Sequence, residues 1–275
     1  MKPAQLLKIS RPRFWIYTVG PFLVALAAAG VLPPVSVILL GLYLTLPANL
    51  LIYGVNDTYD YETDKLNPKK QSYESLLMRS STRSLTKAIL LLNLPFIVIL
   101  LFLLPINAWF WLAVFIFTGV GYSMPPIRAK ARPVIDMVFN ILYVAPAFAA
   151  YTALTGSLPP APVMIASLLW CMAMHAYSAV PDIAADIASK TPTVATLLGR
   201  QKTLLFCGAA YVAAAIISWQ YIAWLAIVSG LVYAVMIAAS LRTTSDEDLF
   251  ALYKRFPLIN TLLGAALFFT VALTS

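Results

Sequence analysis

Long stretches without a charged residue recur along this chain, and each is about as long as a bilayer is thick. A membrane-spanning helix needs roughly 20 mostly apolar residues to cross about 30 Å of hydrocarbon. Backbone polar groups cannot stay unpaired in lipid, so these stretches form helices rather than open strands. The sequence therefore predicts an all-α, polytopic membrane protein with a bundle of about nine transmembrane helices. We place them at 14–31, 36–55, 86–104, 107–122, 134–152, 162–180, 203–219, 221–240 and 256–274.

The composition supports a membrane protein. Of the 275 residues, 61% are hydrophobic and only 11% are charged, whereas soluble domains carry roughly 25% charged residues. We expect a single domain over residues 1–275. The basic N-terminus followed by Ala27-Ala28-Ala29 resembles a cleavable signal peptide, but its apolar run is long enough to span a membrane. Cys171 and Cys207 fall inside apolar stretches and are predicted to be unpaired core residues.

The charged residues predict an orientation. All nineteen Lys and Arg lie in the N-terminal tail, in alternate connections between the predicted helices, or within a turn of these. By the positive-inside rule, the charged face is cytoplasmic, with the N-terminus inside and the C-terminus outside a multi-pass cell-membrane protein. Basic loops that contact anionic membrane lipid explain the net charge of +8. We therefore expect no nucleic-acid partner.

The two halves of the chain share one plan. An offset of 126 residues sets Leu32-Pro33-Pro34 on Leu158-Pro159-Pro160. The same offset sets Asn56 on Asp182 and Asp60 on Asp186. In each half a Pro-Pro turn begins a helix that ends in an acidic cluster, so the pattern predicts two parallel pseudo-repeats with both clusters on one face. Chance alignment in a biased sequence is the alternative.

The first acidic cluster runs from Asn56 to Asp64. On a helix Asp57, Asp60 and Asp64 fall within about 60° of arc. Carboxylates placed so close repel one another unless cations lie among them, and Mg²⁺ binds one or two carboxylates together with substrate phosphates. The cluster thus predicts a Mg²⁺-diphosphate site in which Asn56 takes part. A solvated acidic helix end is the alternative, and it is the role expected of Glu62, which points away from the three aspartates.

The second cluster contains Asp182, Asp186 and Lys190, whose spacing of four would place them on one helix face. Ionisable groups beside a membrane helix are functional candidates by default. His175 lies seven residues before Asp182. It is either a neutral, hydrogen-bonded core histidine or a contact of an acceptor pocket.

A short basic loop follows the fourth predicted helix. It runs from Tyr122 through Pro125-Pro126 to Arg132, and its prolines restrict the backbone. If the loop is extended, Arg128 and Lys130 flank one side and can bind terminal phosphate oxygens. Arg11, with Arg13, can serve the same purpose. Membrane orientation alone is the alternative role for these cations.

At these residues the sequence resembles the UbiA superfamily of intramembrane prenyltransferases. The NDxxDxxxD motif of that family matches Asn56-Asp57-Asp60-Asp64, and its DxxxD motif matches Asp182-Asp186. Its YxxxK-like loop is similar to the segment from Tyr122 to Lys130, with longer spacing here. Many members have an arginine where this chain has Tyr61, and Arg79 or Arg83 is expected to compensate.

Three stretches look most like the carotenoid branch, the lycopene elongase type: DTYDYETDKLNPKK, YSMPPIRAKARPVIDMVFNILY and HAYSAVPDIAADIASKTPTVATLLG. The resemblance implies a prenyltransferase that uses Mg²⁺, dimethylallyl diphosphate and an acyclic carotenoid such as lycopene, adding a C5 unit at each end. The aspartates of both motifs with Asn56 would hold Mg²⁺ on the diphosphate. Lys130, Arg128 and Lys190 would neutralise the leaving group. An aromatic-walled chamber would shield the allylic cation, lined by Tyr53, Tyr143, Tyr177 and Phe139.

Two alternatives stay open at this point. The first is the same chemistry on another acceptor, such as an aromatic acid, a quinone precursor, chlorophyllide or a glycerol ether lipid. The second is a cation-coupled transporter built from two repeats, which would place charged or broken segments near the bilayer midplane.

Overall fold

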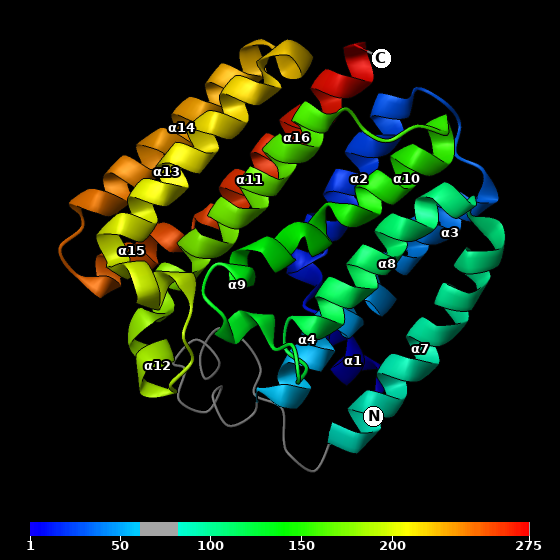
Figure 1. Cartoon of the computed structure of the whole chain (residues 1–275), viewed down its shortest axis with the longest axis horizontal. Coiled ribbons are helices and arrows are strands. Elements are labelled where there is room, and N and C mark those ends of the chain that lie inside the picture. Colours follow the sequence, from blue (N-terminus) through cyan, green and yellow to red (C-terminus); the bar gives the residue numbers. More distant parts are fainter. Residues whose placement is uncertain (61–81, 275) are drawn as a thin grey trace. The chain divides into compact units, whose positions relative to one another are not determined.

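The computed structural model describes residues 1–60 and 82–274, and the regular elements among them are all helical (Figure 1). Four residues of the sequence predictions, Tyr61, Glu62, Asp64 and Arg79, lie outside the described residues. The chain divides into two compact units, Met1–Ala129 with Leu142–Leu158, and Lys130–Ile141 with Pro159–Ser275. Whether the whole chain acts as one domain stays a prediction.

The first unit is a layer of helices in which α10 packs against α2 and α8, and α4 packs against α7. Gly54 allows the close approach of α4 and α7, because a Cβ atom there would lie 2.9 Å from Cδ1 of Ile89. The helices are α1 (Pro3–Ile9), η1 (Pro12–Phe14), α2 (Ile16–Ala29), α3 (Val35–Tyr43), α4 (Leu46–Tyr59), α7 (Thr82–Leu103), α8 (Ile106–Gly121) and α10 (Ala145–Thr155).

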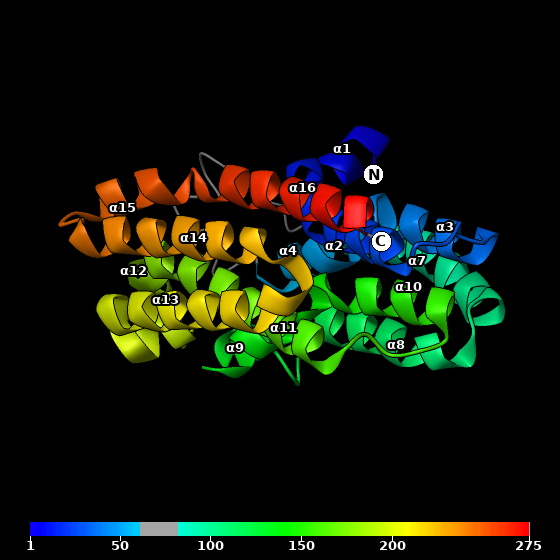
Figure 2. The same cartoon turned by 90° about the horizontal axis from the view of Figure 1, so that it is seen from above.

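In the second unit, α13 packs against α11 on one side and α14 on the other, and Figure 2 shows α13, α14 and α16 one above another. Its elements are α9 (Ile135–Val138), α11 (Ala161–Ala179), η5 (Val180–Asp182), α12 (Ile183–Ala188), α13 (Val194–Ile222), α14 (Trp224–Arg242), α15 (Asp246–Tyr253) and α16 (Phe256–Thr274). Two short 3₁₀ helices, η3 (Ala129–Ala131) and η4 (Phe139–Tyr143), cross the boundaries between the units.

The starts of the two predicted repeats are similar. Helix α3 begins directly after Pro34 and α11 begins directly after Pro160. The first repeat then breaks between α3 and α4. There the side-chain amide of Asn49 donates to the carbonyl oxygens of Leu44 and Thr45, both at 2.8 Å. A carbonyl released by a break inside the membrane needs such a donor, so Asn49 stabilises the bend.

The predicted count of nine spans is not confirmed. Among the described residues, seven helices are long and apolar enough to cross a membrane, or eight if one bent pair counts as a span. The bent pair, Ile135–Tyr143 with Ala145–Thr155 at 45°, corresponds to the predicted span 134–152. The predicted span 107–122 corresponds to α8, which has only 16 residues. Helical hydrogen bonds continue past α8, since the amide of Met124 donates to the carbonyl of Val120 at 3.0 Å.

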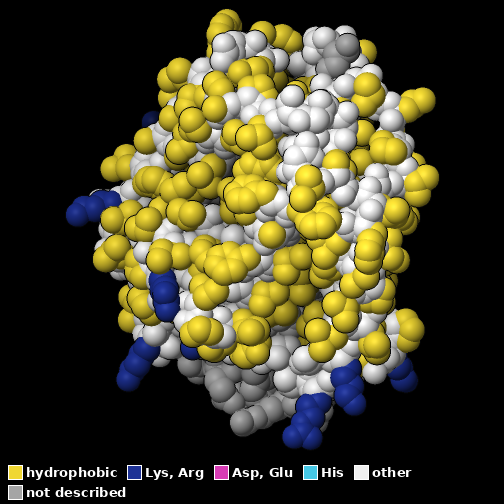
Figure 3. All heavy atoms as spheres, turned by 45° about the vertical axis from the view of Figure 1, so that its right-hand side comes forward, with side chains coloured by type: hydrophobic (Ala, Val, Ile, Leu, Met, Phe, Trp, Pro, Cys, Tyr) yellow, Lys and Arg dark blue, Asp and Glu magenta, His cyan; other side chains and the backbone are white. Residues whose placement is uncertain are grey.

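The surface agrees with a membrane environment. Many large hydrophobic side chains are exposed, including Phe102, Phe110 and Ile216. On the face in Figure 3, hydrophobic side chains make up much of the surface. Exposed apolar side chains of this kind suit helices that contact lipid.

Candidate active site

The first acidic motif lies at the end of α4. Asn56 and Asp57 belong to its last turns, and Asp60 is its C-cap residue. The Asp57 and Asp60 residues are only 3% and 1% exposed. Water does not stabilise these two carboxylates as it would those of a solvated helix end, so that alternative does not fit them. A buried carboxylate requires hydrogen-bond donors or cations.

Arg11 supplies one of these cations. Its Nη2 donates to Oδ1 of Asp57 at 2.8 Å, and its side chain is 14% exposed. The guanidinium also lies over the ring of Tyr53, 4.6 Å from the centroid. Arg11 is thus part of the first motif's surroundings, so membrane orientation is not its only role.

Asn56 connects the motif to the loop that follows α8. Its Nδ2 donates to Oδ2 of Asp60 at 2.6 Å and to Oγ of Ser123 at 3.1 Å. Ser123 is buried. Sequence reasoning selected the neighbouring Tyr122, which is the C-cap residue of α8, and missed Ser123. A small hydroxyl residue beside the predicted loop motif was the available signal.

Aromatic rings gather beside Arg11 and the motif. The hydroxyl oxygens of Tyr53 and Tyr143 lie 3.5 Å apart, so the structure brings these two predicted residues together. Phe14 and Tyr17 complete the cluster, with Phe14 to Tyr53 at 6.1 Å and Tyr17 to Tyr143 at 5.8 Å between ring centroids. Neither was predicted, although both follow Arg11 at the start of the first span. Ring faces arranged in this way attract cations.

The second acidic motif belongs to the second unit. Asp182 is the N-cap residue of α12, and Asp186 lies within that helix. Oδ2 of Asp186 accepts a hydrogen bond from Oγ1 of Thr193 at 3.3 Å, and its backbone carbonyl accepts one from the amide of Thr191 at 2.8 Å. The turn after α12 therefore folds back onto Asp186.

The prediction that Lys190 shares a helix face with the two aspartates is wrong. Helix α12 ends at Ala188, and Lys190 has a left-handed backbone with φ of 54°. The extended geometry predicted for the basic loop is also wrong. Arg128 has φ of 41°, and Lys130 lies in the 3₁₀ turn η3. Arg128 belongs to the first unit and Lys130 to the second.

Three candidate diphosphate-binding cations share an unusual backbone. Arg11, Arg128 and Lys190 have φ of 52°, 41° and 54°, and only two other non-glycine residues in the described part of the chain have positive φ. For residues with a Cβ atom this region is uncommon. Such strained residues cluster at functional sites, where surrounding contacts hold them.

The remaining predicted pocket residues lie in the second unit. His175 lies against a carboxylate, with its Nε2 3.3 Å from Oδ2 of Asp136. The hydroxyl of Tyr177 lies 3.0 Å from Oγ of Ser240, and its ring packs edge-on against Phe256. Phe139 begins η4. A role for His175, Tyr177 or Phe139 in an acceptor pocket stays a prediction.

The chemistry of both motifs suits Mg²⁺ bound together with phosphate. Within residues 1–60 and 82–274, no group of three or more His, Cys, Asp and Glu side chains could hold a metal ion. Each motif instead presents two aspartates within the described residues, Asp57 with Asp60 and Asp182 with Asp186, and the first pair has Asn56 beside it. Mg²⁺ commonly uses one or two carboxylates with water and substrate phosphates as its other ligands, and the donor set fits that pattern.

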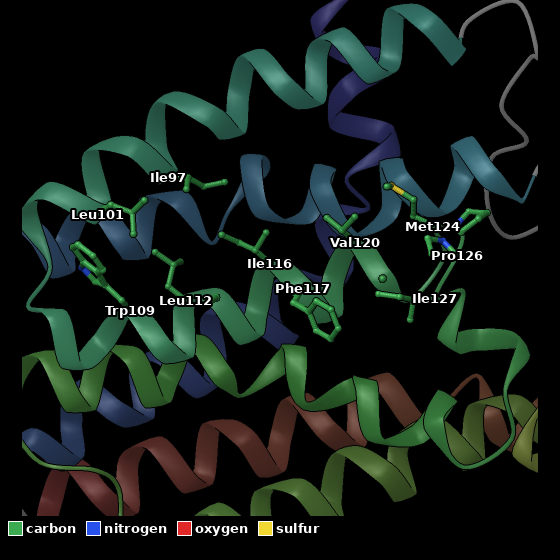
Figure 4. A pocket seen from close by; sticks show the side chains of 13 residues that line it. Ile97, Leu101, Trp109, Leu112, Ile116, Phe117, Val120, Met124, Pro126 and Ile127 are labelled. Atoms are coloured by element: carbon green, nitrogen blue, oxygen red, sulfur yellow. The ribbon is translucent and has the colours of Figure 1, made fainter.

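An apolar groove of about 510 Å³ lies in the first unit between α7, α8 and the loop after α8 (Figure 4). Ile97 and Leu101 line it from α7, and Figure 4 shows Phe117 and Val120 on α8. Phe117 is exposed. The groove thus opens at the surface, with a lining suited to hydrocarbon.

Comparisons with known proteins agree with these features. The model of the UbiA prenyltransferase family matches residues 14–251. A "Lycopene elongase/hydratase" of Haloferax volcanii is 38% identical over 268 residues, covering 93% of this chain and 84% of that protein. One of the same description from Halobacterium salinarum is 39% identical over 206 residues, 74% of each chain. Among solved structures, a UbiA homolog from Archaeoglobus fulgidus bound to DMAPP and Mg²⁺ has a TM-score of 0.71 at 21% identity, over 97% of this chain and 98% of that one.

The family model covers most of the chain, and the buried motif residues, the helical fold and these relatives agree with it. This chain belongs to the UbiA prenyltransferase family and is an integral membrane prenyltransferase.

Proposed function

We propose that this enzyme transfers an allylic prenyl group from dimethylallyl diphosphate to lycopene or another acyclic carotenoid, with Mg²⁺ as cofactor. The descriptions of the Haloferax and Halobacterium relatives support the acceptor. The ligands of the Archaeoglobus neighbour support the donor and the metal. The expected product chain is longer by one C5 unit for each end that reacts.

One observation carries the proposal: the buried carboxylates of the first motif lie beside a cation and a group of aromatic rings. Arg11 pairs with Asp57 and covers the face of Tyr53. Tyr53, Tyr143, Phe14 and Tyr17 form a continuous cluster. Allylic transfer needs carboxylates that bind a diphosphate through a metal ion, and it needs aromatic ring faces that stabilise a developing cation. The first motif and the aromatic cluster place these two kinds of group side by side.

In the proposed mechanism, the metal would be held by Asn56, Asp57, Asp60, Asp64, Asp182 and Asp186. Mg²⁺, when bound, neutralises charge on the leaving diphosphate. Lys130, Arg128, Lys190 and Arg11 bind its outer oxygens. Tyr122 and Asn56 would contact this diphosphate, and Asn56 also keeps Asp60 in place through its amide.

The bonds exchanged are defined by the substrates. The allylic C–O bond breaks, and its electron pair leaves with the diphosphate. A terminal double bond of the acceptor supplies the pair for the new C–C bond, which leaves a positive charge on the acceptor. That charge is lost when a proton leaves, or when water adds and then releases a proton. The aromatic cluster of the first unit, and in the second unit Tyr177, Phe139 and His175, are proposed to exclude water from the allylic cation until the new C–C bond has formed.

We further propose a cell-membrane orientation in which the N-terminus and the two motifs face the cytoplasm and the C-terminus faces outside. Reporter fusions at each terminus test it: a cytoplasm-active reporter should work at the N-terminus alone. A reporter that works equally at both ends contradicts the orientation. The transporter alternative has no support, because the chain belongs to a prenyltransferase family.

The proposed function is tested with purified protein in liposomes. Lycopene, dimethylallyl diphosphate and Mg²⁺ should give products lengthened by one and two C5 units, resolved by chromatography and mass spectrometry. Chelation of Mg²⁺ should abolish them, and its return should restore them. Parallel reactions contain a quinone precursor, chlorophyllide or a glycerol ether lipid, and geranyl diphosphate as a longer donor. Product from one of these acceptors and none from lycopene would move the assignment to that acceptor.

A further inference from the structure

A buried carboxylate outside both acidic motifs organises the second unit. Asp136 is 0% exposed. Its Oδ2 accepts a hydrogen bond from the amide of Val194 at 2.7 Å and lies 3.3 Å from Nε2 of His175, while Oδ1 accepts from the amide of Met137 at 3.0 Å. An ionised carboxylate accepts only, so Nε2 of His175 is the donor. Both oxygens are therefore satisfied by the protein itself.

One set of these bonds leads to the second acidic motif. Val194 is the first residue of α13, and Thr193 before it is the N-cap residue. The Thr193 hydroxyl donates to Oδ2 of Asp186 at 3.3 Å. A negative charge at the first turn of a helix is favourable because the amides there are unpaired. Asp136 thus holds the start of α13, and through Thr193 this start holds a carboxylate of the motif.

The backbone hydrogen bonds of Asp136 lead to the segment that follows η3, the turn that carries Lys130. The amide of Asp136 donates to the carbonyl of Arg132 at 2.9 Å, and its own carbonyl accepts from Nδ2 of Asn140 at 2.7 Å. Between these contacts, Val134 has φ of 74°. A β-branched residue in that region is an outlier, and surrounding contacts must hold it there. The turn that carries Lys130 is thereby attached to Asp136.

We propose that Asp136, oriented by His175, is a positioning residue that holds the Lys130 turn at a fixed place relative to Asp186. In the prenyl-transfer reaction, this spacing sets where a cation and a metal-binding carboxylate meet one diphosphate. The functional consequence rests on the proposed function; the positioning itself does not. In this role His175 acts through Asp136. No catalytic step is assigned to either residue.

Three variants test this, two of them a matched pair at His175. Asp136→Asn keeps the size of the side chain but turns an amide NH₂ toward one of its donors. It should raise the KM for dimethylallyl diphosphate and the Mg²⁺ concentration for half-maximal rate about tenfold, with the KM for lycopene unchanged. His175→Leu removes the donor and should shift both values in the same direction. His175→Gln keeps an N–H donor and should restore most of the wild-type values.

A purely structural role gives a different result. Asp136→Asn would then lower the melting temperature and leave both KM values and the Mg²⁺ requirement of the folded protein unchanged, and the two His175 variants would behave alike. Unchanged kinetic values in folded Asp136→Asn would overturn the proposal, and so would equal behaviour of His175→Leu and His175→Gln.

Hydrogen exchange decides the positioning without an activity measurement. In Asp136→Asn, backbone amides of residues 186–196 and 130–138 should exchange faster than in the wild type, while those of 206–216 in the middle of α13 should not change. Exchange rates in residues 186–196 and 130–138 that equal those of the wild type would overturn the proposal. If wild-type protein makes no product with any acceptor, the proposed function fails, and the exchange result still stands or falls by itself.

Discussion

Nη2 of Arg11 lies 2.8 Å from Oδ1 of Asp57, which is 46 positions later in the chain. The pair joins the segment before the first long helix to the last turns of α4. Both side chains are largely buried. The N-terminal segment is therefore part of the candidate site, and Arg11 does more than orient the protein in the membrane.

Replacing Arg11 by Met should destabilise the protein, because it leaves the buried charge of Asp57 without this partner. Breaking a buried ion pair in this way costs about 3–5 kcal/mol. Thermal or denaturant unfolding in detergent measures the change. Arg13→Met is the control: Arg13 is exposed and lies over Phe14, so its loss should cost about 1 kcal/mol or less. Equal effects of the two substitutions would show that the pair with Asp57 is not special.

The ring of Tyr53 should matter more than its hydroxyl. Tyr53→Phe keeps the ring face under Arg11 and removes only a contact of 3.5 Å with Tyr143, so we expect less than a threefold change in kcat. Tyr53→Leu removes the cation–π attraction, worth about 1–2 kcal/mol in a desolvated site, and should lower kcat about tenfold. Steady-state rates at saturating donor and acceptor test this. A Phe variant as impaired as the Leu variant would assign the role to the hydroxyl.

Ser123 should contribute to metal binding through Asn56. Ser123→Ala removes the acceptor of one hydrogen bond from Nδ2 of Asn56, which is worth about 1 kcal/mol. We expect the Mg²⁺ concentration for half-maximal rate to rise about fivefold. Titration of activity with Mg²⁺ measures it. Ser218→Ala, far along α13 with its hydroxyl bonded to the carbonyl of Ala214, is the matched control and should titrate as the wild type does.

Lys190→Gly should separate stability from activity. The left-handed backbone at Lys190, with φ of 54°, costs about 1–2 kcal/mol for a residue with a Cβ atom. Glycine removes this cost. Its greater conformational freedom in the unfolded chain lowers the stability by about 0.4–1 kcal/mol, which offsets part of the gain. The melting temperature should stay the same or rise slightly, while the KM for the donor rises. A lower melting temperature with an unchanged KM would mean that Lys190 has a structural role only.

The helical architecture could be predicted from the sequence because uncharged runs of about 20 residues in lipid have one backbone solution. The Pro-Pro starts of the two repeats also lie where the offset placed them, at Val35 and Ala161. The number of spans could not be counted in this way. Hydropathy does not show that the 134–152 segment bends by 45° or that α8 has only 16 residues.

The site was only partly predictable. Asn56, Asp57 and Arg11 could be selected by residue type and position. In the structure Arg11 pairs with Asp57, and the neighbouring Asn56 donates a hydrogen bond to Asp60. Ser123 and the donors to Asp136 depend on tertiary packing, which residue spacing does not reveal. The register predicted for Lys190 failed for a local reason: α12 ends at Ala188, so the periodicity of a helix does not extend to it.

The most direct test of the account compares one substitution in each motif in the liposome reaction with lycopene, dimethylallyl diphosphate and Mg²⁺. Asp57→Asn and Asp182→Asn each change a proposed metal ligand, and Glu247→Gln changes an exposed acidic residue of α15. The account predicts lengthened carotenoid from the wild type and from Glu247→Gln. It predicts at least a hundredfold loss of rate, on the order of 3 kcal/mol in transition-state stabilisation, in each motif variant. Motif variants that fold and make product at the wild-type rate would contradict it.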